Sequence, residues 1–193
     1  MSSRKRPHIP KRKRFFLGCE GESERSYGQF LGQLSENRGL PNHIDTVTIN
    51  GGSPRVIVTG AIVQAKDRSE RRGSYLFKAL MLDSDKLAES PNGAEKEQSE
   101  LEHLATNHDI LLIWQTPCHE GFLLRHIKDC RSLKPPDSRE ALSMLRKRWP
   151  DYRKPMQVSA LVEIISLEDL LHFAEGKRSL RIFLEKLGFT NNP

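Results

Sequence analysis

Apolar runs of strand length alternate with segments of helical periodicity over residues 15–128, and this alternation most constrains the fold. The predicted strands cover residues 15–19, 44–49, 76–82 and 110–114, and the predicted helices cover residues 24–34, 55–66, 94–106 and 119–128. Such alternation favours an α/β fold with a mainly parallel sheet and helices on both faces. From about residue 135 the strand signal fades, which predicts a helical C-terminal part.

The chain has 193 residues, and we predict a single domain over residues 15–193. Cys19, Cys118 and Cys130 form no C-x-x-C pair, so neither a disulfide framework nor a zinc site is expected. No apolar stretch approaches the length of a membrane span, and no apolar segment follows the basic N-terminus before Phe15. We therefore expect a cytoplasmic protein with reduced thiols and no membrane contact.

Positive charge is concentrated in residues 1–14, which contain seven basic side chains and no acidic one. The other residues carry 24 basic and 25 acidic side chains, although the whole chain has a net charge of +6. We predict a flexible basic arm that binds the phosphate backbone of DNA or RNA. A terminus that only increases solubility explains the same charges. The arm residues are Arg4, Lys5, Arg6, Lys11, Arg12, Lys13 and Arg14.

Two acidic strings follow predicted strands. Glu20 and Glu24 come after the first strand, and Asp83 and Asp85 follow the third. The carboxyl ends of parallel strands share one edge of a sheet, where ligands bind in open α/β folds. Four carboxylates meeting there would repel one another unless a cation lay between them, and Mg²⁺ or Mn²⁺ prefers such oxygen ligands. In an extended chain, Asp83 and Asp85 would point to the same side.

Structural explanations exist for the same acidic residues. Glu24 is at a position where an acidic side chain stabilises the first turn of a helix, with Ser23 as the predicted N-cap. Asp83 and Asp85 flank a serine, and both residue types are common in turns. Glu20 is harder to explain in this way, because it does not help the predicted cap.

A third polar string, TPCHEGFLLRH at residues 116–126, follows the fourth strand. Glu120 is placed to complete an acidic cluster, and His126 to approach a phosphate or transfer a proton. His126 on the surface of a helix is the simpler alternative. Lys86, next to Asp85, is placed to neutralise a phosphate oxygen. The sequence contains no G-x-x-x-x-G-K-[ST] phosphate loop, so ATP hydrolysis by this chain is not expected.

These motifs resemble those of the RloB family, whose fold is TOPRIM-like. The family's E-G-x-x-T-E string followed by an aromatic residue is similar to EGESE at residues 20–24 with Tyr27, where serine replaces threonine. The TOPRIM D-x-D motif resembles Asp83-Ser84-Asp85. The family's N-P-x-F-E string with a later L-L-x-H run resembles residues 116–126, with Thr116 and His119 in place of asparagine and phenylalanine.

The resemblance implies a Mg²⁺-dependent phosphoryl-transfer centre. The first glutamate, Glu20, would bind metal or transfer a proton, and the two aspartates would bind metal. RloB-like proteins are associated with prokaryotic restriction and anti-phage defence loci, often beside an ATPase partner. The resemblance therefore implies a role in defence and a possible ATPase partner for this chain.

The leading prediction is a metal-dependent nuclease. Glu20, Asp83 and Asp85 would bind Mg²⁺ or Mn²⁺, with Glu24 and Glu120 at the edge of the site and Lys86 near the phosphate. One alternative is a non-catalytic subunit that binds nucleic acid or a nucleotide and acts with a partner ATPase. A second alternative is an α/β adaptor in which the acidic residues only cap helices.

Overall fold

The computed structural model describes residues 12–89 and 93–189. Its strands are β1 (Lys13–Cys19), β2 (Asn42–Thr48), β3 (Phe77–Asp83) and β4 (Ile110–Gln115). Its helices are α1 (Glu22–Asn37), α2 (Pro54–Arg72), the 3₁₀ helix η1 (Asp85–Glu89), α3 (Ala94–Thr106), α4 (His119–Leu124), α5 (Ser138–Arg148), α6 (Val158–Ile164), α7 (Leu167–Glu175) and α8 (Arg178–Leu187). The predicted α/β class with a parallel sheet is confirmed.

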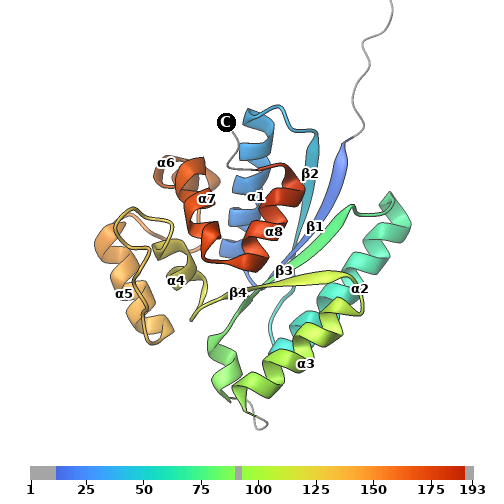
Figure 1. Cartoon of the computed structure of the whole chain (residues 1–193), viewed down its shortest axis with the longest axis horizontal. Coiled ribbons are helices and arrows are strands. Elements are labelled where there is room, and N and C mark those ends of the chain that lie inside the picture. The colour runs from blue at the N-terminus through green and yellow to red at the C-terminus, as the bar shows by residue number, and fades with distance from the viewer. Residues whose placement is uncertain (1–11, 90–92, 190–193) are drawn as a thin grey trace, which may run out of the picture.

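The four strands form one parallel sheet in the order β2-β1-β3-β4. Helices α2 and α3 cover one face, and α1 and α8 lie on the other with the remaining C-terminal helices beyond them (Figure 1). Strands covered on both faces are expected to be apolar throughout, and residues 15–19 of β1 are all buried. The sheet is thus the middle layer of a three-layer structure.

Side chains of the central strands alternate between two hydrophobic cores. In β1, Phe15 and Leu17 pack with α1 and the C-terminal helices, whereas Phe16 packs with α2 and α3. In β3, Met81 belongs to the first core and Leu80 to the second. This is the two-residue period of a strand buried on both faces.

Helix α1 approaches the sheet closely because Gly28 faces it. A Cβ atom at Gly28 would lie 2.5 Å from Thr46 Cγ2 and 2.8 Å from Leu17 Cδ2. Any larger residue would push α1 away from β1 and β2. Since α1 begins just after Glu20, this contact also fixes the acidic string at the end of β1.

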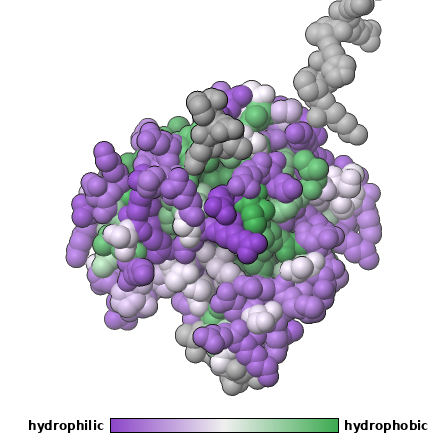
Figure 2. All heavy atoms as spheres, in the orientation of Figure 1, coloured by the Kyte–Doolittle hydropathy of each residue, from purple (hydrophilic) through white to green (hydrophobic). Residues whose placement is uncertain are grey.

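The C-terminal part is helical, as predicted, and it completes the first core rather than standing apart. Leu161, Phe173, Leu180 and Phe183 are buried in the same cluster as Phe15 of β1. The segment 158–165, which has an ambiguous pattern, contains α6. In the view of Figure 2, hydrophilic side chains cover most of the surface, and hydrophobic residues show in smaller areas between them.

Candidate functional site

The acidic strings meet at the carboxyl edge of the sheet. Because β1 and β3 are parallel neighbours, Glu20 and Asp83 leave the sheet at the same edge. Asp83 pairs with Gln115 in the register of β3 and β4, so the polar string after β4 also begins here. The edge holds a pocket of about 490 Å³. Its lining includes Glu20, Gly21, Glu22, Ser23, Glu24, Asp83, His119, Glu120 and Lys154.

Glu20 lies directly after β1, with 14% of its side chain exposed. Its Oε1 accepts a hydrogen bond from the Lys86 ammonium, which also forms an ion pair with it. Its Oε2 is buried and has no hydrogen-bond partner. One oxygen of Glu20 is therefore neutralised by Lys86, and the other remains available to a ligand. The structure thus brings Lys86 and Glu20 together at the edge where both were predicted.

Asp83 is the last residue of β3 and lies in a negative environment. The pKa of its carboxyl group is raised to about 9, mainly by burial and also by the negative charges of Glu24, Glu20, Asp85 and Glu120. Its Oδ1 is buried without a hydrogen-bond partner. Asp83 therefore keeps its proton at neutral pH, because several carboxylates lie near it. A bound cation would favour its ionised form.

Asp85 departs from the predicted geometry. The chain does not stay extended after Asp83, because η1 begins at Asp85, so the two aspartates are not related by strand alternation. The backbone N–H groups of Ser84 and Asp85 both donate to the Pro117 carbonyl, at 3.0 and 2.9 Å. The Ser138 hydroxyl donates to Asp85 Oδ2, while Asp85 Oδ1 is buried and has no partner. The D-x-D segment is thus fixed by the loop after β4.

Glu24 performs the structural role that its position allows. Helix α1 begins at Glu22 with Gly21 as its N-cap, so the predicted cap at Ser23 is wrong. Glu24, at the third position of the helix, accepts a hydrogen bond from Gly21 N at 3.1 Å through Oε2. Its carboxylate also faces the pocket, where its charge raises the pKa of Asp83. The two explanations of Glu24 are therefore compatible.

Glu120 is buried at the start of α4 and is held by residues that the sequence did not indicate. The Tyr152 hydroxyl donates to Oε1 at 2.7 Å, and the Lys154 ammonium forms an ion pair with the same oxygen. Burial alone would raise the pKa of Glu120, but the hydrogen bonds from Lys154 and Tyr152 outweigh it and lower the pKa below its ordinary value. Glu120 is therefore ionised beside the other carboxylates.

Helix α4 can lie at this edge because Gly121 has no side chain. A Cβ atom there would be 2.8 Å from Pro117 Cδ and 3.0 Å from the Thr116 carbonyl. The small residue lets the start of α4 rest on the loop that also binds Ser84 and Asp85. One loop therefore positions both Glu120 and the D-x-D segment.

His119 also lines the pocket and is buried. Burial lowers its pKa, although the nearby charge of Glu24 opposes this shift, so the ring is neutral. The Gln115 side-chain nitrogen lies 2.6 Å from His119 Nδ1, and an amide nitrogen can only donate. The proton of the neutral ring is therefore on Nε2, which is buried and has no partner. His119 thus has an unused N–H donor.

His126 does not line this pocket. It is fully buried among Tyr27, Phe122 and Phe173, with ring centroids 5.5, 5.0 and 4.4 Å away. Nδ1 lies 2.9 Å from the Phe122 carbonyl, and Nε2 lies 2.9 Å from the Tyr27 hydroxyl. Burial lowers its pKa to about 3. The structure therefore places His126 in a hydrophobic core rather than with the acidic residues.

The basic arm is only partly described. Arg4, Lys5, Arg6 and Lys11 lie outside the described residues, and Arg12 is exposed. Lys13 and Arg14 belong to β1, so the predicted arm of residues 1–14 extends too far into the fold.

Arg14 has structural partners inside the fold. Its guanidinium donates to the Gly73 carbonyl, lies 3.7 Å from Asp45 Oδ2 and stacks 4.4 Å from the centroid of the Tyr75 ring. Arg14 therefore holds the end of α2 against the sheet.

Tyr152, Lys154 and Ser138 were not predicted as site residues. They come from the C-terminal part, where no strand end or acidic motif marks them. Tyr152 and Lys154 follow α5 and return to the edge of the sheet to contact Glu120. Only the tertiary structure reveals these contacts.

The donor set fits a hard divalent cation. Glu20 Oε2, Asp83 Oδ1 and Asp85 Oδ1 are three buried carboxylate oxygens without partners, each from a different residue. Oxygen ligands of this kind suit Mg²⁺ or Mn²⁺. Within residues 12–89 and 93–189, no three His, Cys, Asp or Glu side chains already have the spacing of a formed metal site. Binding would therefore require side-chain adjustment at this edge.

The fold and site define an α/β protein with a carboxylate-lined pocket at the carboxyl edge of a parallel sheet. No protein-family model, curated protein or solved structure matches the chain. In the part of the chain that the structure describes, no helix is both long enough and apolar enough to cross a membrane.

Proposed function

We propose that the protein is a metal-dependent nuclease with a TOPRIM-like fold that cleaves phosphodiester bonds in DNA or RNA. The observation that carries this proposal is the set of three unpartnered carboxylate oxygens, on Glu20, Asp83 and Asp85. Unsatisfied buried acceptors are costly, and a bound cation would remove that cost. The RloB resemblance of the same residues favours a role in prokaryotic anti-phage or restriction-linked defence.

Glu20, Asp83 and Asp85 would hold the Mg²⁺ or Mn²⁺ ion. When bound, the ion supplies a Lewis acid that binds phosphate oxygens and lowers the pKa of a water nucleophile. Asp83 must lose its proton to act as a ligand, and its raised pKa predicts that binding releases a proton near neutral pH. Proton release on metal addition is therefore one signature of this site.

The neighbouring side chains have separate tasks in this proposal. Lys86 neutralises Glu20 Oε1 and places an ammonium group beside the phosphate. His119 offers its Nε2–H to an oxygen of the substrate, because that donor is otherwise unused. Glu120 and Glu24 define the negative wall of the pocket, and Lys154 and Tyr152 keep Glu120 in place.

The test uses amide variants that keep side-chain shape and remove a charged oxygen. Glu20→Gln and Asp83→Asn should each reduce Mg²⁺-dependent cleavage of plasmid, single-stranded DNA or tRNA by about a hundredfold or more. Glu70→Gln, at an exposed position of α2, is the matched control and should cleave like the unmodified protein. Thermal melts establish that each variant is folded. Unchanged cleavage in both site variants would refute the assignment.

A second candidate is a subunit that binds nucleic acid or a nucleotide and acts with a partner ATPase. Its supporting observation is that Lys86 and Lys154 already neutralise Glu20 and Glu120 without a metal. In that case the purified chain would bind oligonucleotides but cleave none of the three substrates with Mg²⁺ or Mn²⁺. Cleavage that appears only with a co-expressed ATPase would favour this candidate.

A further inference from the structure

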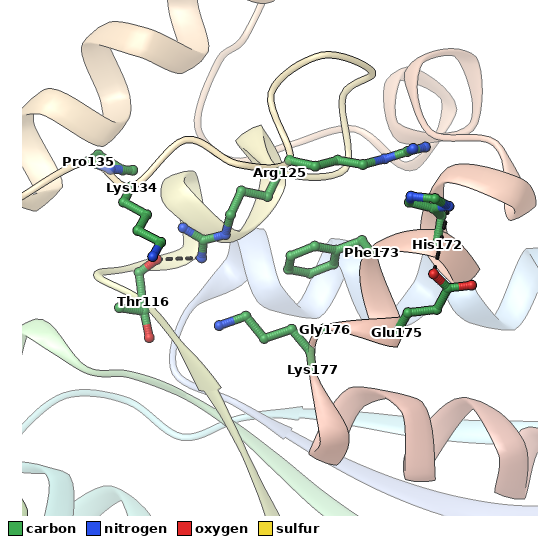
Figure 3. A pocket seen from close by; sticks show the side chains of 10 residues that line it. Thr116, Arg125, Lys134, Pro135, His172, Phe173, Glu175, Gly176 and Lys177 are labelled. Carbon is green, nitrogen blue, oxygen red and sulfur yellow. Dashed lines mark hydrogen bonds and ion pairs between the residues drawn. The ribbon is translucent and has the colours of Figure 1, made fainter.

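A second pocket, of about 550 Å³, is rich in positive charge. It is formed by the loop after β4, the end of α4, residues 131–135 and the α7–α8 connection. Figure 3 shows the head groups of Arg125, Lys134 and Lys177 directed toward the same side of the Phe173 ring, near Thr116. We call this the cationic pocket, after those three residues.

Arg125 is the most buried cation of the cationic pocket, with 7% of the residue exposed. One of its terminal nitrogens donates to the Thr116 carbonyl at 2.5 Å, and its Nε has no hydrogen-bond partner. No carboxylate within residues 12–89 and 93–189 forms an ion pair with it. A buried charge without a counterion is costly, so this arrangement indicates a missing anion.

Lys177 adds a second charge of the same sign. Burial lowers its pKa, and the positive charge of Arg125 lowers it further, which places the two cations near each other. Neither Lys177 nor Lys134 forms an ion pair with any described carboxylate. By contrast, the other two basic residues of the lining have acidic partners: Arg131 lies 2.9 Å from Asp169, and His172 lies 3.9 Å from Glu175.

The segment from β4 to α4 links the cationic pocket with the acidic one. Thr116 lines the cationic pocket, and the next residue, Pro117, accepts the backbone hydrogen bonds of Ser84 and Asp85. Helix α4 has Glu120 in its first turn and Arg125 as its C-cap. The two residues are separated by about 7.5 Å along the helix axis and by a rotation of about 140°, so they lie on different faces of α4. The segment from β4 to α4 therefore contributes an anion to one pocket and a cation to the other.

We propose that the cationic pocket binds a phosphate group of the nucleic-acid strand, at a nucleotide other than the one being cleaved. The inference rests on the proposed nuclease function, because it assigns part of that substrate to a second pocket. Guanidinium and ammonium groups are the side chains that bind phosphate most strongly. The volume exceeds that of a single ion, and Phe173 and Pro135 provide apolar walls for the remainder of a nucleotide.

The test measures binding in EDTA, so that it does not depend on cleavage. The probes are inorganic phosphate, AMP and a fluorescent single-stranded RNA, at one fixed salt concentration. Lys177→Gln and Lys134→Gln should each weaken RNA binding about tenfold. Lys66→Gln, at an exposed position of α2, is the control with the same change of charge. Arg125→Gln is an additional variant, used only if its thermal melt is normal.

The outcomes separate this inference from the proposed function. Weaker RNA binding in the two pocket variants, with Lys66→Gln unchanged, supports the pocket even if no cleavage is found. Weaker binding of AMP or phosphate in the same variants, together with that of RNA, supports the same assignment. The assignment would be overturned if Lys66→Gln lost as much RNA affinity as the pocket variants, or if neither pocket variant lost any. It would also be overturned if the pocket variants bound AMP more weakly but RNA as before. Each of these results would hold even if metal-dependent cleavage is established.

Discussion

At the scale of the residue, His126 shows how burial decides a role that sequence leaves open. Its hydrogen bonds define one neutral tautomer: Nδ1–H donates to the Phe122 carbonyl, and Nε2 accepts from the Tyr27 hydroxyl. Protonation of Nε2 would place a positive charge inside a buried aromatic cluster. His126 therefore stabilises the core as an uncharged side chain.

This arrangement predicts a specific loss of stability in acid. The pKa of His126 is lowered to about 3 in the folded protein, so the unfolded chain binds a proton from about pH 6.5 downward while the folded chain does not. Stability from this group is complete above pH 6.5 and decreases as the pH falls toward 3. The free energy of unfolding is measured in urea for the unmodified protein and for His126→Phe. The difference between the two should become less favourable to the unmodified protein by about 1–3 kcal/mol from pH 7.5 to pH 4.5.

The control for this prediction is His103→Phe, at an exposed position of α3. Its effect on the free energy of unfolding should stay within about 0.5 kcal/mol at every pH. A difference between His126→Phe and the unmodified protein that does not change with pH would contradict the assigned neutral state.

The residues of the candidate site were predictable to the extent that strand ends mark them. Glu20 and Asp83 follow strands whose apolar runs are clear, and parallel strands bring their ends to one edge. Tyr152, Lys154 and Arg125 could not be found in the same way, because they lie outside strand ends and their contacts depend on tertiary packing. His126 has the right residue type, but the turn after α4 places it in the core.

At the scale of the element, α5 connects helix capping with the acidic pocket. Asp137 is its N-cap and accepts a hydrogen bond from Glu140 N at 2.8 Å. The next residue, Ser138, donates to Asp85. The start of this helix therefore positions a hydroxyl group at the D-x-D segment, so the cap also supports the site.

Asp137→Ala should destabilise the protein by about 1 kcal/mol, because an unsatisfied amide remains at the start of α5. For a chain of this length that loss lowers the melting temperature by about 2–4 °C. Arg139→Ala, one residue into the exposed first turn, should change it by less than about 1 °C. Equal melting temperatures for Asp137→Ala and the unmodified protein would show that the cap contributes nothing.

Element boundaries were predicted best where glycine or a clear period marks them. The helix at Ala94–Thr106 has the predicted limits, with Gly93 before it. Helix α2 continues to Arg72, beyond the predicted end at residue 66, because its charged residues are compatible with an exposed helix face, and Gly73 at φ 91° ends it. Helix α4 ends at Leu124, four residues before the predicted end, because Arg125 caps it and donates to the Thr116 carbonyl.

At the scale of the whole molecule, charge is divided between distinct regions. Carboxylates line a pocket at the carboxyl edge of the sheet, and cations line a second pocket that includes Thr116, just after β4. The net charge of +6 comes mainly from residues 1–14, of which Arg14 is used inside the fold. Affinity for a nucleic acid would then have two contributions. The basic N-terminal residues would bind phosphates regardless of nucleotide sequence, and the cationic pocket would bind a phosphate at one defined place.

The first contribution predicts a change in salt dependence. Replacing Arg4, Lys5 and Arg6 together by glutamine should weaken RNA binding and reduce the slope of log K against log salt by about 2, since each cation displaces about 0.7 counterion from a single strand. The control replaces Lys66, Arg71 and Arg72 of α2, which changes the net charge by the same amount. Fluorescence anisotropy from 50 to 300 mM salt gives both slopes. Equal slopes for the two triple variants would assign the effect to net charge and reject a role for the N-terminal residues.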